Sequence, residues 1–144
     1  MTPPLVVLDT QVFVSAMIGY EDAASHRACK AVGSEDVRLA ISDDFLREPS
    51  RVVGYPEVEA RVASAARAVR IAIDVGVMGT LHHPRRYDWP SIVDPNDGWM
   101  LDLAWHAGAD YIVTRDGHLD SVSSRFFPVE VLTAPQLLAR ITND

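Results

Sequence analysis

The sequence predicts an α/β fold in which helices cover a mainly parallel β-sheet in three layers, α/β/α. Short, continuous apolar runs such as residues 5–8 (LVVL) suit strands that are buried on both faces of a sheet. Segments with helical signals lie between these runs, so strands and helices alternate along the chain. The 144 residues suffice for one domain and are too few for two ordinary ones, and we see no repeat or linker.

The first half of the chain begins with the strand 5–8, which ends abruptly at Asp9. Further elements are expected in this half: helices over about 11–17 and 23–32, a strand over 37–41, and a long helix over 58–73. Ser42 has the character of a helix N-cap, because Asp43 and Asp44 follow it in the favourable first turn.

The second half begins with an irregular stretch, 79–93, which we interpret as a loop that contains a short strand at most. Residues 94–97 (DPND) predict a strong helix start, and that helix should stop at Gly108. Strands are expected over 111–113 and 129–132. Thr133 and Gln136 then have the spacing of a capping box for a last helix.

The composition limits the classes of function. With 20 acidic and 13 basic residues the net charge is −7, which argues against a broad basic surface for nucleic acid but not against an acidic metal site. Cys29 is the only cysteine, so we expect a reducing, cytoplasmic environment and a buried thiol. No apolar run approaches the roughly 20 residues that span a membrane, and no secretory signal is recognisable.

Several acidic residues are expected near the carboxyl edge of the sheet, where parallel sheets bind ligands. Asp9 and Asp116 each follow a predicted strand, Asp97 lies in the first turn of a helix, and Glu48 follows the second strand. Singly, each acid has a plainer explanation as a cap or a surface residue. Together they would repel one another unless a hard cation such as Mg²⁺ or Mn²⁺ bound them. Such an ion can activate water against a phosphodiester.

The same residues resemble the motifs of the PIN-domain family. Residues 8–16 (LDTQVFVSA) resemble its opening motif, and residues 42–56 resemble its second, the glutamate-bearing helix. Residues 94–101 (DPNDGWML) and 107–116 (AGADYIVTRD) resemble its third and fourth acidic motifs. The similarity is greatest to the bacterial branch of VapC-like toxins of toxin–antitoxin systems. It spans nearly the whole chain, with all four motifs in order.

This resemblance implies a five-stranded parallel sheet and an Mg²⁺- or Mn²⁺-dependent ribonuclease, with an antitoxin protein as partner and a homodimeric assembly. The family's four acidic positions, catalytic and metal-binding, correspond to Asp9, Glu48, Asp97 and Asp116. Asp94, Gln11 and Thr114 correspond to supporting positions, Thr114 through its hydroxyl. Apart from the resemblance, the residues suited to contact RNA phosphates are Arg115, beside the acidic site, and Arg85 and Arg86.

Two residues depart from the family pattern. Gln11 stands where the family usually has Asn, which lengthens the amide side chain beside Asp9. Pro49 directly follows Glu48, and a proline there disfavours helical geometry at Glu48. Asp44, one turn earlier, is an alternative second acid on the same helix face.

Other interpretations remain at this point. Gln11 and Pro49 are compatible with a PIN-like binding or regulatory module of weak or absent nuclease activity. Aspartyl-phosphate phosphotransferases of the haloacid-dehalogenase group need an Asp where this chain has Gln11, and response-regulator receivers need a late Lys that it lacks. Outside the acidic motifs, we expect His82 and His83 on the surface and Trp99 and Trp105 in the core or an interface.

Overall fold

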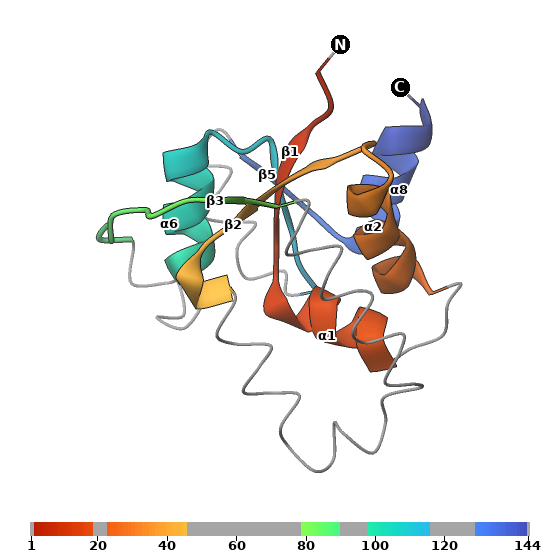
Figure 1. The fold of residues 1–144 in the computed structure, drawn as a ribbon, viewed down its shortest axis with the longest axis horizontal. Helices are drawn as coiled ribbons and strands as arrows, with labels where there is room; N and C mark the ends of the chain where they lie inside the picture. Colours follow the sequence, from red (N-terminus) through yellow and green to blue (C-terminus); the bar gives the residue numbers. More distant parts are fainter. Residues whose placement is uncertain (1, 19–22, 46–78, 90–97, 116–128, 144) are drawn as a thin grey trace.

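The computed structural model describes residues 2–18, 23–45, 79–89, 98–115 and 129–143 and has the predicted α/β architecture (Figure 1). The strands are β1 (Leu5–Leu8), β2 (Arg38–Ile41), β3 (Gly79–Leu81), β4 (Tyr111–Val113) and β5 (Glu130–Leu132). The helices are α1 (Thr10–Ile18), α2 (Ala24–Gly33), α6 (Gly98–Ala107) and α8 (Ala134–Asn143). The helix expected over 58–73 and the helix start at 94–97 lie outside the described residues.

The five described strands form one sheet in the order β3-β2-β1-β4-β5, and all neighbouring pairs are parallel. The chain first builds outward from β1 through β2 to β3 and then continues on the other side with β4 and β5. The direction of winding therefore changes between β1 and β4, at the carboxyl edge where open parallel sheets bind ligands. The prediction of a mainly parallel, five-stranded sheet is confirmed.

Helices cover both faces of the sheet, which explains why the strands are continuously apolar. On one face Val6 and Leu8 are fully buried in a cluster with side chains of α1, α2 and α8. On the other face Val7 and Ile112 are fully buried against α6. Figure 1 shows α6 on one side of the sheet and α2 and α8 on the other. No helix among the described residues is long and apolar enough to cross a membrane.

The sequence signals at element ends are largely confirmed. Gly108 ends α6 with a φ of +68°, a conformation that glycine adopts without steric cost. Ser42 Oγ accepts a hydrogen bond from Phe45 N at 3.5 Å, as an N-cap does. The irregular stretch over 79–93 does contain a short strand, because Gly79–Leu81 pairs with β2 and forms an edge of the sheet.

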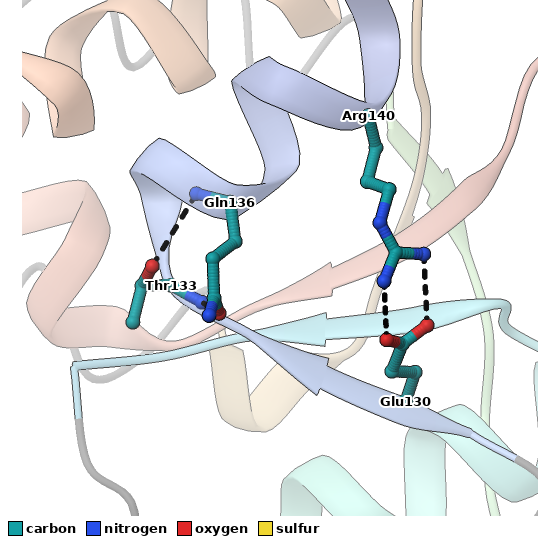
Figure 2. A network of polar contacts seen from close by, with 4 residues as sticks. All are labelled: Glu130, Thr133, Gln136 and Arg140. Carbon is teal, nitrogen blue, oxygen red and sulfur yellow. Dashed lines mark hydrogen bonds and ion pairs between the residues drawn. The ribbon is translucent and has the colours of Figure 1, made fainter. Parts of the chain in front are cut away.

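The predicted capping box begins α8 (Figure 2). Thr133 N donates to Gln136 Oε1 at 2.8 Å, and Gln136 N donates to Thr133 Oγ1 at 3.3 Å, so two orphan donors are satisfied reciprocally. Further along α8, Arg140 forms a two-point ion pair with Glu130 at 3.0 and 2.5 Å. The hydrogen bonds to Glu130 and Tyr111 raise the pKa of Arg140. These contacts join α8 to β5 and β4.

The capping box can be tested by removing its hydroxyl. Thr133→Ala is expected to lower the free energy of unfolding by about 1 kcal/mol, since it leaves a backbone donor at the start of α8 without its partner. Urea denaturation should show a lower midpoint with an unchanged slope. Thr133→Ser retains the hydroxyl and serves as the matched control. Equal midpoints for the alanine and serine variants would show that the box adds no stability.

The single cysteine lies in the core, as the sequence predicts. Cys29 is 2% exposed on α2, and burial raises the pKa of its thiol to about 12. At pH 8 only roughly one thiol in ten thousand is then the reactive thiolate. We expect no alkylation of Cys29 by a maleimide in the native chain at pH 8 and full alkylation in urea, measured by mass spectrometry. Rapid native labelling would contradict this placement.

Candidate active site

Asp9 lies at the carboxyl end of β1, where the sheet changes winding direction. Its backbone N–H donates to Val113 O at 2.8 Å, which extends the pairing of β1 with β4 by one residue. Its carbonyl oxygen accepts from Val12 N at 3.0 Å and Phe13 N at 3.3 Å, which begins α1. The backbone of Asp9 is therefore held by the sheet on one side and by a helix on the other, and its side chain is 7% exposed.

The carboxylate of Asp9 bonds to two different elements. Oδ1 accepts from Gln11 N at 3.1 Å, the bond of an N-cap at the positive end of α1. Oδ2 accepts from Thr114 Oγ1 at 2.7 Å, across a sequence separation of 105 residues. Capping explains the first bond but does not require the second. A carboxylate has about four lone-pair positions, more than these two bonds use.

Thr114 is itself fixed and buried. It directly follows β4, is 2% exposed, and its backbone N–H donates to Leu132 O at 2.9 Å. Its hydroxyl therefore approaches Asp9 from a rigid position on the neighbouring strand. The result is a preorganised pair of oxygen-bearing side chains at the carboxyl edge of the sheet. Hard oxygen donors of this kind fit Mg²⁺ or Mn²⁺.

Four further acidic residues are predicted for this site. Glu48, Asp94, Asp97 and Asp116 lie outside the described residues. Within the described ranges, no three potential ligands among His, Cys, Asp and Glu come together as a metal-binding group. The structure thus brings together Asp9, Thr114 and the backbone of Gln11.

Gln11 takes part through its main chain. Its N–H caps Asp9 Oδ1, whereas its side chain is exposed. Any residue except proline supplies this bond, so the longer amide side chain does not disturb the observed orientation of Asp9. Asp44 lies in the helical residues 43–45 that follow β2, the strand beside β1, and is partly exposed. Its position at the same edge is compatible with the alternative role that the sequence suggests.

The predicted arginines are all exposed. Arg115 directly follows Thr114, and its Nη1 donates to Ser15 Oγ of α1 at 2.9 Å. This bond holds the guanidinium beside α1, whose first turn Asp9 caps. Arg85 and Arg86 lie in the segment that follows β3.

The histidines after β3 form a small surface cluster. The rings of His82 and His106 pack edge to face with centroids 5.6 Å apart, and His83 Nδ1 lies 3.9 Å from Asp43 Oδ2. Burial, together with the nearby His106 and His83, lowers the pKa of His82. His83 is exposed and His82 half-buried. The predicted surface placement is confirmed for His83 and in part for His82.

Sequence reasoning missed Asp102 on α6. This carboxylate is 8% exposed, and its Oδ1 accepts from Tyr87 N at 3.0 Å and from Trp89 Nε1 at 2.8 Å. The available signal was an acid within the apolar run of α6, where Leu101 and Leu103 are fully buried. Such a position costs free energy unless the carboxylate finds partners.

The tryptophans of α6 differ from one another. Trp99 packs against both core clusters, and its ring centroid lies 6.1 Å from that of Phe45, as a core position predicts. Trp105 is 49% exposed, so it does not lie in the core, and an interface position stays a prediction for this residue. It directly follows the buried run Met100–Ala104 of α6.

Comparisons with known proteins agree with the architecture. A family model described as PIN domain matches residues 5–118, which include β1 and β4 with the Asp9–Thr114 pair. The crystal structure of VapBC2 from Rickettsia felis, bound to a DNA fragment from their promoter, contains a chain similar in fold, with a TM-score of 0.57 and 14% identity. That match covers 90% of this chain and 98% of the other. No curated protein sequence matches significantly. The match to more than half of the chain shows that this protein belongs to the PIN-domain family.

Proposed function

We propose that this chain is a metal-dependent endoribonuclease and the toxin component of a toxin–antitoxin pair. PIN domains are generally nucleases. The observation that carries the proposal is the buried Asp9 carboxylate, oriented by Thr114 where the sheet changes winding direction. A capping role alone leaves this second hydrogen bond unexplained, whereas a ligand that must present its oxygens in a fixed direction requires such an orienting partner.

In this proposal Asp9, Glu48, Asp97 and Asp116 hold one or two Mg²⁺ or Mn²⁺ ions. Such ions supply a water nucleophile at neutral pH and stabilise negative charge on the phosphodiester. Thr114 orients Asp9, and the α1 N-terminus stabilises its charge. Arg115, fixed by Ser15, is placed to bind an RNA phosphate next to the acids.

We further propose a cognate antitoxin, a homodimer and a cytoplasmic location. The support is the sequence resemblance to VapC-like toxins and the fold similarity to a chain of a complex named VapBC2. Light scattering of the purified chain tests the dimer, for which we expect twice the mass of one chain. A monomer at all concentrations would contradict it.

The function is tested with purified chain, labelled single-stranded RNA and DNA of the same sequence, and controlled metal. We expect RNA cleavage in Mg²⁺ or Mn²⁺, none in EDTA, and recovery when metal is added back in excess. Asp9→Asn, purified in parallel by the same procedure, controls for contaminating ribonucleases. Calorimetric titration with Mn²⁺ measures metal binding independently of substrate choice.

The outcomes separate the two interpretations left by the sequence. Metal-dependent RNA cleavage that is lost in the Asp9 variant supports the nuclease. Absence of both cleavage and saturable Mn²⁺ binding overturns it and favours a PIN-like binding or regulatory module. Preferential cleavage of DNA overturns the substrate assignment.

A further inference from the structure

The segment after β3, residues 82–89, presents basic and aromatic side chains at the surface. We call it the 82–89 loop. Arg85, Arg86 and Tyr87 are exposed, Tyr87 by 39%. The loop also contains the exposed Asp88, so the two arginines leave it with a positive balance in a chain whose net charge is −7. The chain as a whole repels polyanions, and a local basic surface of this kind is where one can bind.

The 82–89 loop has a defined conformation although it has no regular secondary structure. Asp102 Oδ1 on α6 accepts hydrogen bonds from both Tyr87 N and Trp89 Nε1. The rings of Tyr87 and Trp89 contact each other with centroids 5.9 Å apart, and His82 packs on His106. The loop is thus fixed to α6 at both of its ends, which reduces the entropy that a ligand must remove on binding.

The loop starts at the same edge of the sheet as Asp9. Leu81 pairs with Ile41, and the register of β2 with β1 places both level with Leu8. Strands in a sheet lie about 4.8 Å apart, so the two-strand separation puts the start of the loop about 10 Å from Asp9. Figure 1 shows the segment after β3 running out beside α6. One single-stranded RNA can therefore lie along this edge and reach both places.

We propose that the 82–89 loop is a second RNA-contact surface of this chain and that Asp102 is its positioning residue. Arg85 and Arg86 bind backbone phosphates, and Tyr87 stacks on a base. The proposal rests on the proposed function, since it takes single-stranded RNA as the ligand. Arginines beside an exposed aromatic ring fit phosphate and base together, whereas an acidic peptide would use the arginines alone.

Binding is measured by fluorescence anisotropy with a labelled single-stranded RNA in EDTA, so that no metal-dependent cleavage occurs. Arg85→Gln with Arg86→Gln should lower the slope of log affinity against log salt by about 1.4, since each phosphate contact to a single strand contributes about 0.7. Tyr87→Ala should weaken binding at least about fivefold, and Tyr87→Phe should not, because stacking needs only the ring. Unchanged slope and affinity in these surface variants overturn the proposal.

A second ligand, an acidic peptide, tests whether the loop binds RNA or protein. If the arginine variants bind RNA as the wild type does but lose binding to a poly-glutamate peptide, the loop is a protein-docking surface and the RNA assignment is wrong.

Failure of the nuclease proposal can be distinguished from failure of the loop proposal. A chain that cleaves no RNA but loses RNA affinity in the loop variants supports the loop and not the nuclease. A chain that cleaves a dinucleotide normally, with an unchanged KM for long RNA in these variants, supports the nuclease and not the loop.

The role of Asp102 has its own readout. In Asp102→Ala the amide of Tyr87 loses its acceptor, so we expect faster hydrogen exchange at Tyr87 and faster trypsin cleavage after Arg85 and Arg86. RNA affinity should fall together with this loss of protection. Asp102→Asn keeps an acceptor oxygen and should retain the wild-type exchange, even if the alanine variant is too unstable to purify. Fast exchange at Tyr87 in the wild type would contradict the anchoring role.

Discussion

Asp9→Asn is expected to reduce metal-dependent RNA cleavage at least about 1000-fold, a loss of about 4 kcal/mol in transition-state stabilisation. The substitution removes the negative charge that would bind the ion but preserves the shape of the side chain. Steady-state cleavage rates at saturating Mn²⁺ measure the effect on chemistry. Calorimetric titration measures the accompanying loss of metal affinity.

The same substitution should leave the fold nearly unchanged. Asn is as good an N-cap as Asp, so its amide oxygen can still accept from Gln11 N at the start of α1. The amide nitrogen can donate to Thr114 Oγ1, which then acts as an acceptor. The free energy of unfolding, measured by urea denaturation, should therefore change by no more than about 1 kcal/mol. A variant that is folded, binds Mn²⁺ and cuts RNA like the wild type would exclude Asp9 from the site.

Local signals predicted the elements that build the site. The abrupt end of the apolar run at Leu8 placed Asp9 at a strand end, and the AGADYIV segment gave β4 with its observed bounds, Tyr111–Val113. The helix stop at Gly108 and the capping box at Thr133 also depend on neighbouring residues only. Such features are readable because hydrogen bonds within a few residues determine them.

The rest depends on contacts between distant segments. The hydrogen bond from Arg115 to Ser15 joins residues 100 positions apart, and no sequence pattern predicts which hydroxyl accepts from the guanidinium. Asp102 could be seen as an acid in an apolar helix, but its partners Tyr87 and Trp89 lie in a stretch without periodicity. β3 has only three residues, of which Leu81 is 48% exposed at the sheet edge, so neither length nor alternation marks it. For Gln11, sequence suggested a side-chain role, whereas the main chain makes the bond.

Thr114→Val should show how much the orientation of the Asp9 carboxylate contributes to activity when its negative charge is retained. Valine has the shape of threonine but no hydroxyl, so the buried Oδ2 of Asp9 loses its observed partner at the end of β4. Leaving a buried acceptor unpaired costs about 1–3 kcal/mol of stability, which urea denaturation can measure. Groups that orient a metal ligand typically contribute about 10–100-fold, so we expect a loss of that size in cleavage rate or Mn²⁺ affinity.

Thr114→Ser is the matched control because it keeps the hydroxyl and removes only the methyl group. A buried methyl group lost from the core lowers stability by about 1 kcal/mol, so the serine variant should be somewhat less stable yet nearly as active as the wild type. Stability then falls in both variants, whereas activity falls only in the valine variant, which a purely structural role of Thr114 does not allow. If the valine and serine variants lose activity only in proportion to their stability, the hydroxyl holds the two strands together and does not orient a catalytic carboxylate.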